Sequence, residues 1–329
     1  MSVALTVGVD IGGTNMETAL VDDQGSIVTT YQRPTGIGMA PVHFVAEVVD
    51  CVGKLQSESP EGRIGALGVG FAGQIDRETG AVRSAPNLGW KNVPIRDELE
   101  RALNIPTYVI NDVQAAVWGE WQKGAGQGLS DLVCLFVGTG IGGGVIAGGR
   151  LLTGSTGSAG ELGHIILDLH GPPCHCGANG CLEAHAGGWA IALRAQQAVV
   201  TEPEEGKALL DMVQGHAEAL TAATVAQVAH RGDPLALRLV AEEGEALGVG
   251  LASVVNAFNP RRVILGGGVI EGLPELIDLV EDTIWLRALS AATDSLDIVK
   301  AQLGKQSGVV GAGLLARHLL EGKEWLIPS

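Results

Sequence analysis

Apolar residues recur along the first third of the chain at two spacings, one typical of strands and one typical of helices. Short apolar runs that end at turn residues predict strands, and apolar positions three or four residues apart predict helices. The predicted strands are 3–10, 17–21, 27–32, 64–71 and 107–110, and the predicted helices are 42–55, 95–103 and 113–122. Between the second and third strands, 22-DDQG-25 has the composition of a hairpin turn. This alternation predicts an α/β fold.

The same plan starts again in the middle of the chain. A strand at 132–137 leads into 138-GTGIGGG-144 and a second strand that ends at 147. The later elements are helices near 190–198, 224–230 and 234–258, a strand at 262–265 and a closing helix near 309–320. The repeated order of strand, glycine turn and strand predicts an internal duplication. We expect two closely joined α/β domains, 1–116 with 309–329 as the smaller and 117–308 as the larger.

Composition and charge narrow the class of protein. Of the 329 residues, 46% are apolar and 18% are charged, which is typical of a folded globular chain. The net charge of −16 disfavours nucleic acid and anionic membrane as partners. The N-terminus has no basic segment of a signal peptide, and we find no uninterrupted apolar window of about 18 residues. We therefore expect a cytoplasmic protein whose five cysteines are reduced.

Three glycine-rich turns follow apolar strands. The first, 10-DIGGTN-15, places the Asp10 carboxylate beside exposed backbone N–H groups, which suit phosphate oxygens and Mg²⁺. The second is 138-GTGIGGG-144, and the third, 266-GGG-268, leads into a helical segment. Each alone is typical of a tight turn, but three together favour phosphate binding. The sequence has no P-loop and no GxGxxG between a strand and a helix, which disfavours a P-loop NTPase or a Rossmann dehydrogenase.

Three cysteines lie together in 174-CHCGANGC-181, where glycines allow the backbone to curl. With His164 from 160-GELGHI-165, they form a Cys₃His set that suits a structural Zn²⁺. The predicted metal ligands are His164, Cys174, Cys176 and Cys181. The rival fourth ligands are His170, His175 and His185. The alternative interpretation is a group of reduced thiols or a redox pair.

Taken in order, these motifs resemble a known family. The stretches 10-DIGGT-14, 111-ND-112, 138-GTGIGGG-144, 160-GELGHI-165 and 174-CHCGANGCLE-183 resemble the ROK sugar kinases, named for repressors, open reading frames and kinases. The cysteine motif with its upstream glutamate and histidine is specific to that family, whereas DIGGT alone marks the wider actin and hexokinase superfamily. The resemblance, which runs from about residue 7 to 316, implies an actin-like (ribonuclease H-like) fold with an active cleft between two domains. It also implies ATP with Mg²⁺ as donor and a hexose as acceptor.

The resemblance also implies roles for individual residues. Asp112 corresponds to the general base that takes the proton of the sugar's 6-hydroxyl, although an Asp there also suits a helix cap. The implied sugar-binding residues are Gly73, Asn87, Asn111, Asp112, Glu161, His164 and Glu183. The implied nucleotide-binding residues are Asp10, Gly12, Gly13, Thr14, Thr139, Gly140, Gly142, Gly267 and Gly268. His164 is expected to bind zinc through one ring nitrogen and a sugar hydroxyl through the other.

Two positions depart from the family pattern, and one segment has no assigned role. Asn15 stands where many members have lysine, so Mg²⁺ must neutralise more of the phosphate charge. Ala72 replaces a frequent proline beside the sugar loop. No substrate role is assigned to 187-GGW-189.

Several functions follow from the resemblance. We expect a cytoplasmic phosphotransferase of glycolysis, a homodimer, that phosphorylates glucose at the 6-hydroxyl; the alternatives are N-acetylglucosamine, N-acetylmannosamine, mannose and fructose. A sugar-responsive repressor would carry a DNA-binding module before the first glycine turn, and Asp10 lies only ten residues from the start. A non-catalytic sugar-sensing protein is disfavoured because the set of motifs is complete.

Overall fold

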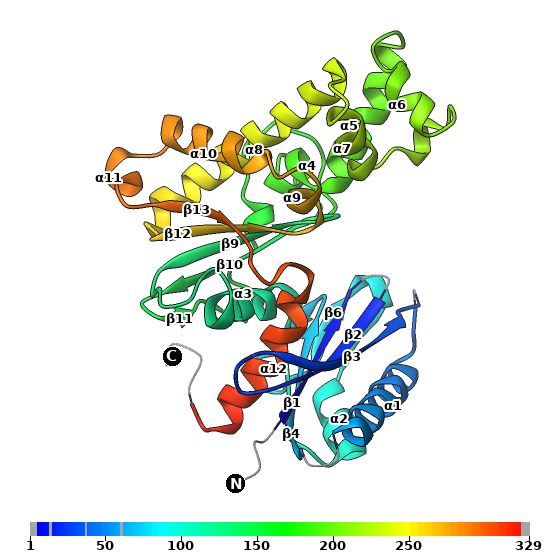
Figure 1. Cartoon of the computed structure of the whole chain (residues 1–329), viewed down its shortest axis with the longest axis vertical. Coiled ribbons are helices and arrows are strands. Elements are labelled where there is room, and N and C mark those ends of the chain that lie inside the picture. Colours follow the sequence, from blue (N-terminus) through cyan, green and yellow to red (C-terminus); the bar gives the residue numbers. More distant parts are fainter. Residues whose placement is uncertain (1–4, 13–14, 37, 60–61, 324–329) are drawn as a thin grey trace. The chain divides into compact units, whose positions relative to one another are not determined.

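The computed structural model describes residues 5–12, 15–36, 38–59 and 62–323 (Figure 1). The strands are β1 (Leu5–Ile11), β2 (Asn15–Val21), β3 (Ile27–Pro34), β4 (Ile64–Phe71), β5 (Gln74–Ile75), β6 (Val82–Ala85), β7 (Trp90–Val93), β8 (Thr107–Asn111), β9 (Leu132–Val137), β10 (Ile141–Ala147), β11 (Arg150–Leu151), β12 (Arg262–Gly266) and β13 (Asp297–Lys300).

The helices are α1 (Pro41–Glu58), α2 (Ile95–Leu103), α3 (Asp112–Lys123), α4 (Leu182–Ala186), α5 (Gly188–Thr201), α6 (Lys207–Met212), α7 (Ala222–Ala229), α8 (Pro234–Phe258), α9 (Gly268–Gly272), α10 (Leu276–Arg287), α11 (Ser290–Thr293) and α12 (Ser307–Leu320). Short 3₁₀ helices are η1 (Pro86–Leu88), η2 (Leu162–His164), η3 (Ala217–Ala219) and η4 (Gly304–Gln306). Every helix and strand that the hydrophobic pattern predicts is confirmed within a few residues, over the part of the chain that is described.

Two five-stranded sheets share one strand order. The first runs β3-β2-β1-β4-β8 and the second β11-β10-β9-β12-β13. When the strands are numbered within each sheet, both orders read third, second, first, fourth, fifth. In both sheets the first strand is parallel to the fourth, and the fourth is parallel to the fifth. This repeated topology supports the predicted internal duplication.

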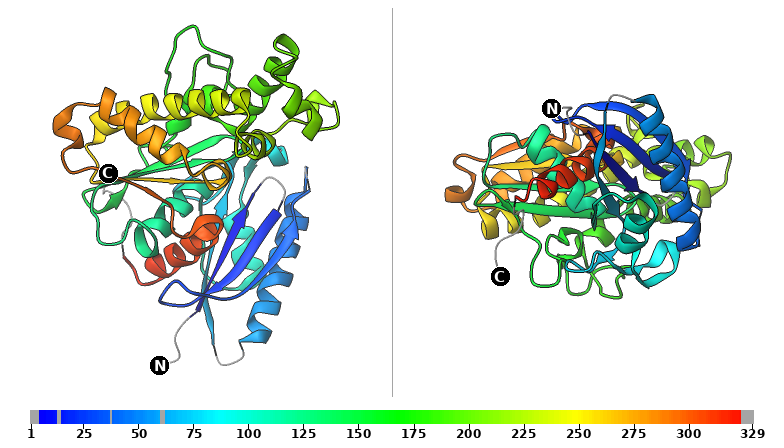
Figure 2. Two further views of the ribbon diagram at one scale, coloured as in Figure 1. Left: turned by 45° about the horizontal axis from the view of Figure 1, so that its top comes forward. Right: turned by 90° about the horizontal axis from the view of Figure 1, so that it is seen from below.

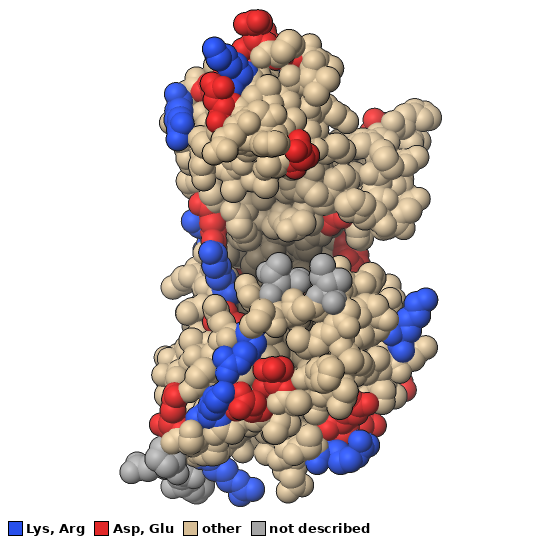
Figure 3. Space-filling model, turned by 90° about the vertical axis from the view of Figure 1, so that its right-hand side faces the viewer, with Lys and Arg blue, Asp and Glu red and all other residues tan. Residues whose placement is uncertain are grey.

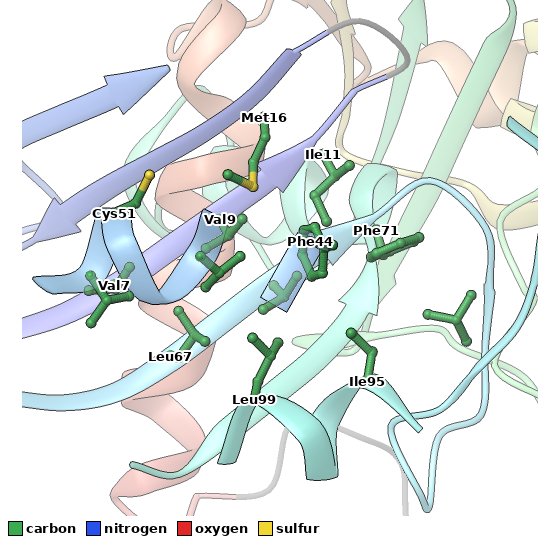
Figure 4. Close-up of a cluster of buried hydrophobic side chains, with 14 of the residues drawn as sticks. Val7, Val9, Ile11, Met16, Phe44, Cys51, Leu67, Phe71, Ile95 and Leu99 are labelled. Atoms are coloured by element: carbon green, nitrogen blue, oxygen red, sulfur yellow. The ribbon is translucent and has the colours of Figure 1, made fainter. Parts of the chain in front are cut away.

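The two faces of the first sheet pack differently because side chains alternate along each strand. Val7, Val9 and Leu67 point to one face and form a core with Phe44 of α1 (Figure 4). The opposite face carries glycines. A Cβ on Gly8 would lie 1.9 Å from the Val309 carbonyl oxygen of α12, so the helix backbone can lie directly on the strand.

Helix α3 lies beside α12, as both views in Figure 2 show. The helices approach closely at Gly311, where a Cβ would lie 1.8 Å from the Ala115 carbonyl oxygen. The buried carboxylate of Glu120 also connects the two helices through hydrogen bonds. It accepts hydrogen bonds from Leu303 N at 2.7 Å and Ser307 Oγ at 2.9 Å, as well as from the backbone N–H groups of residues 125 and 302.

The long helix α8 has a capping residue at each end. Asp233 caps its N-terminus by accepting a hydrogen bond from Ala236 N at 2.9 Å, and Asn259 ends it in the left-handed conformation. Midway along α8, the fully buried Glu243 accepts a hydrogen bond at 3.1 Å from Arg194 of α5. This contact joins α5 to α8, and burial raises the pKa of Glu243 well above its usual range.

The chain forms two compact units. The first comprises Met1–Ser130, Gly144–Gly160 and Gln302–Ser329, and the second comprises Asp131–Gly143 and Glu161–Ala301. The predicted boundaries, 1–116 with 309–329 and 117–308, remain a prediction about domains. The compact units differ from them at 117–130, 144–160 and 302–308, which belong to the first unit. The first of these segments contains the end of α3, which packs on α12.

The surface in Figure 3 shows basic and acidic side chains interspersed on the face drawn. Ion pairs of the first unit include Arg33 with Asp50 and Arg83 with Asp76. Of the helices in the described ranges, none has the length and apolarity needed to cross a bilayer.

Candidate active site

Two acidic residues lie near each other in the first unit. Asp10 is near the end of β1 and Asp112 is the first residue of α3. Both border Gly70 of β4: a Cβ on Gly70 would lie 3.6 Å from Asp10 Oδ1 and 3.4 Å from Asp112 Cα. A Cβ on Gly308 of α12 would lie 2.4 Å from Asp10 Oδ2. The two glycines therefore leave room for the Asp10 carboxylate.

The surroundings of Asp10 disfavour its negative charge. Burial foremost, then the charges of Asp112 and Glu17, raise the pKa of Asp10 to about 7. A divalent cation would relieve this repulsion, and carboxylates are preferred ligands of Mg²⁺. The donor set at Asp10 therefore fits such a cation.

Asn111, rather than Asp112, caps helix α3. Its Oδ1 accepts a hydrogen bond from Gln114 N at 3.1 Å, and its Nδ2 donates to the Gly73 carbonyl at 3.3 Å. The interpretation of Asp112 as a helix cap is therefore wrong, because the helix begins one residue earlier than the pattern predicted. At the first helical position, the carboxylate of Asp112 lies where the helix dipole favours negative charge.

The other predicted residues of the first unit lie in loops or, in the case of Asn87, in a short 3₁₀ helix. Gly12 N donates to the Asn15 carbonyl at 2.9 Å, which closes the first glycine turn, while Gly13 and Thr14 lie outside the described residues. Gly73 lies against β6, since a Cβ there would be 2.4 Å from the Ser84 carbonyl. Asn87 is exposed in η1.

The second glycine-rich stretch is only partly a turn. Gly138 N donates to the Gly140 carbonyl at 2.9 Å, and β10 begins at Ile141, so Gly142 lies in a strand. The expectation of one glycine turn over 138–144 is wrong. Its glycines instead make room for side chains. A Cβ on Gly140 would lie 2.3 Å from Glu183 Oε2, and one on Gly143 would lie 2.7 Å from Leu162 of η2.

The third glycine turn lies at the end of β12. Gly267 has a φ of +91°, and a Cβ there would lie 2.3 Å from the Val137 carbonyl. Glycine is therefore required at this position. Gly268 begins α9, and a Cβ on it would meet nothing within 4 Å.

The four predicted metal ligands converge in the second unit. The ligand atoms of His164, Cys174, Cys176 and Cys181 all lie within 4.8 Å of one another. Cys176 Sγ is 3.6 Å from Cys181 Sγ, and Cys174 Sγ is 3.7 Å from His164 Nδ1. A tetrahedral zinc ion has ligand–ligand separations of about 3.8 Å between sulfurs and about 3.6 Å between sulfur and nitrogen. The cluster therefore fits a four-coordinate metal.

Burial raises the pKa of the Cys181 thiol to about 12, whereas the backbone N–H of Ala178 chiefly lowers that of Cys176. A bound cation would favour the thiolate form of all three cysteines. The metal-binding group, as found among the described residues, does not include the three histidines considered as alternative fourth ligands, His170, His175 and His185.

Glu183 lies beside both the cysteine cluster and the second glycine turn. Its Oε2 accepts a hydrogen bond from Ile141 N at 2.8 Å, and its Oε1 is 4.0 Å from Cys174 Sγ. Glu161 is exposed just before η2, and its carbonyl accepts a hydrogen bond from His164 N at 3.0 Å. Helices η2 and α4 both pack on the start of β10. The structure therefore brings Glu161, His164 and Glu183 into one region of the second unit.

The predicted residues thus form two groups, one in each unit. Gly70, Gly308 and Glu17, which shape the surroundings of Asp10, were not found from the sequence. Gly70 carried a weak signal, since it lies in the apolar run 64-IGALGVGF-71, where a residue without a side chain indicates close packing.

Comparison with known proteins agrees with this fold and these motifs. The chain belongs to the ROK family, whose model matches residues 6–319. A glucokinase of Streptomyces coelicolor is 35% identical over 319 residues, which are 96% of this chain and 98% of that protein. An N-acetylmannosamine kinase of Shigella boydii is 33% identical, over 95% of this chain and 98% of the relative.

A solved structure is also similar throughout. The ROK family glucokinase from Streptomyces griseus, in complex with glucose and AMPPNP, is 35% identical and has a TM-score of 0.83. The match covers 96% of this chain and 100% of that one. The expected ROK membership and α/β actin-like fold class are confirmed.

Proposed function

We propose that this chain is an ATP-dependent hexose kinase that transfers the γ-phosphoryl group of ATP to the 6-hydroxyl of glucose. The observation that carries this proposal is the pair of acidic residues at Gly70, with Asp10 at a glycine turn and Asp112 at the start of α3. The similarity to glucokinases over the whole chain supports both the reaction and the sugar.

Phosphoryl transfer to a hydroxyl needs a base, a cation and donors to the phosphate oxygens, and residues of this chain could supply or hold each of them. Asp112 would accept the proton of the 6-hydroxyl as that oxygen attacks the γ-phosphorus, and ADP would leave. Asp10 would hold Mg²⁺, which neutralises phosphate charge. Because Asn15 carries no charge, this neutralisation rests more on the cation. Backbone N–H groups of the turns at Gly12 and Thr139 would bind phosphate oxygens.

The other sugar hydroxyls call for donors and acceptors in fixed directions. Glu161, His164 and Glu183 offer these in the second unit, and Asn111 in the first, supported by Gly73 and Asn87 in their loops. His164 Nδ1 faces the thiols at 3.7 Å from Cys174 Sγ, so its Nε2 is the nitrogen that would meet a hydroxyl. The cluster would thus orient one sugar contact.

We propose Zn²⁺ as the metal of the Cys₃His cluster. With four protein ligands and no open position, it would organise structure rather than activate water. Metal analysis of the purified protein should find about one zinc per chain. Zinc-free protein with full sugar affinity would contradict this assignment.

The test of substrate is a coupled ADP-release assay with glucose, mannose, fructose, N-acetylglucosamine and N-acetylmannosamine. We expect glucose to have the highest kcat/KM. The relative that is an N-acetylmannosamine kinase makes that sugar the second candidate. Fast turnover of an N-acetylated sugar with negligible turnover of glucose would overturn the choice of substrate but not of reaction. The homodimer remains a prediction for light scattering to test.

A further inference from the structure

The segment Gly187–Trp189, which joins α4 to α5, takes no part in the roles given above. It is hydrogen-bonded to the second glycine turn through its backbone. Gly188 N donates to the Gly138 carbonyl and Trp189 N donates to the Thr139 carbonyl, both at 3.0 Å. The segment therefore holds two of the three residues of that turn.

Close packing makes this attachment rigid. A Cβ on Gly188 would lie 2.5 Å from the Gly138 carbonyl oxygen, and one on Gly187 would lie 2.8 Å from the Glu183 carbonyl oxygen. A larger residue at either position would have to displace backbone, which is costly in a close-packed interior. The two glycines thus allow the segment to lie directly against the turn.

The indole ring of Trp189 faces the cysteine loop. It packs against the buried cluster formed by Cys174, Cys181 and Ala184. Its ring centroid is 4.3 Å from that of His175, and the rings are inclined by 32°. His175 therefore packs on the indole, and the same tryptophan touches the metal loop by its ring and the glycine turn by its backbone.

We propose that Trp189 is a positioning residue that couples the folded cysteine loop to the nucleotide-binding turn at Gly138–Gly140. The bound metal would then support the affinity for ATP as well as the affinity for sugar. This inference rests on the proposed function, since it takes the turn to bind ATP phosphates. Trp189 would thus hold the turn at Gly138–Gly140 in place, in addition to the turn's own hydrogen bond from Gly138 N to the Gly140 carbonyl.

Trp189→Ala is the first test, because it removes the ring and leaves the backbone. We expect the affinity for the non-hydrolysable analogue AMPPNP, measured by calorimetry, to fall about five- to tenfold, the equivalent of one neutral hydrogen bond or slightly more. Glucose affinity should change less than about twofold. In the coupled assay, KM for ATP should rise while kcat stays within about twofold.

Two further variants separate the ring's packing from general damage. Trp189→Phe keeps an aromatic ring beside His175 and removes the indole N–H, which is buried without a partner among the described residues. It should bind AMPPNP like the wild type. Trp285→Ala removes a half-exposed indole from α10 of the same unit and should also bind normally.

Metal removal completes the test. After chelation and return to excess Mg²⁺, the zinc-free wild type should bind AMPPNP more weakly by a similar factor. Zinc-free Trp189→Ala should lose little more, because the coupling is already lost. If Trp189→Ala does not fold, Gly188→Ala decides, since it displaces the turn without touching the cysteine loop. It should keep its zinc and lose AMPPNP affinity.

The inference is overturned if folded Trp189→Ala binds AMPPNP within twofold of the wild type or, where that variant does not fold, if Gly188→Ala does. Equal losses of glucose and AMPPNP affinity in both variants would indicate general damage and would also overturn it. If the wild type itself does not bind AMPPNP, the proposed function fails first and the inference fails with it.

Discussion

Replacing Asp10 by Asn should stabilise the metal-free protein and abolish its proposed activity. Burial, Asp112 and Glu17 raise the pKa of Asp10 from 3.8 to about 7, so the folded state disfavours a charge that the unfolded chain carries freely. That difference in pKa corresponds to an upper value of about 4 kcal/mol. An amide of the same shape removes the charge, and hence this penalty.

The sign of the effect with pH follows from linkage. Below about pH 3 the carboxyl is mostly protonated in both states, so the wild type and Asp10→Asn should have similar free energies of unfolding. As pH rises from about 4 to 7, the unfolded wild type loses its proton before the folded one does, and the wild type loses stability. Asp10→Asn should therefore gain relative to the wild type across this window and hold its full advantage at pH 8.

The assay is urea denaturation of both proteins at pH 4.5, 6 and 8 in EDTA. Titrating groups that do not interact with Asp10 contribute equally to both proteins and cancel in the difference, whereas Asp112 and Glu17 belong to the effect being measured. Repeating the pH 8 measurement with Mg²⁺ should narrow the gap, because the cation stabilises only the carboxylate. A difference that does not grow with pH, or an Asp10→Asn protein less stable at pH 8, would refute the reasoning.

Three further substitutions test the supporting structure. Cys176→Ser should release the metal and weaken glucose binding about tenfold or more, as seen by metal analysis and calorimetry; retention of zinc would exclude Cys176 as a ligand. Glu120→Gln should lower the free energy of unfolding by about 2–4 kcal/mol in urea, because one carboxylate accepts four hydrogen bonds there; an unchanged midpoint would contradict this. Arg194→Met should lower the free energy of unfolding by about 3–5 kcal/mol at pH 8, because Glu243 is left buried and unpaired. The double variant with Glu243→Leu should regain most of that stability.

The hydrophobic pattern predicted most of the fold because the strands are short, buried and bounded by turn residues. It did not predict β5, β6 and β7, which have two to four residues each, or β13 and α10. Strands of that length carry too little periodicity to identify. Helix α10 is different: it has twelve residues and buries Leu276, Val280 and Ile284 at helical spacing, so the pattern was present and was missed. The strand order within each sheet likewise depends on contacts distant in sequence.

The candidate site was predictable as a set of motifs but not as a set of contacts. The three cysteines of the metal group were found from their spacing, since one ion requires its ligands close together, whereas His164 was one of four candidate histidines for the fourth ligand. The cap by Asn111 was missed because Asn and Asp are both common at that position. Gly140 was assigned to phosphate, and that role stays a prediction. The structure shows in addition that Gly140 and Gly143 leave room for Glu183 and Leu162, which the local sequence does not show.

The central claim is that Asp112 acts as the general base toward the sugar hydroxyl. Asp112→Asn keeps the shape of the side chain and removes its basicity. The direct measurement is kcat with glucose and ATP, together with the calorimetric Kd for glucose. We predict that kcat falls by about 10²–10⁴ while Kd changes by no more than about threefold. A variant that retains near-normal kcat would contradict the account.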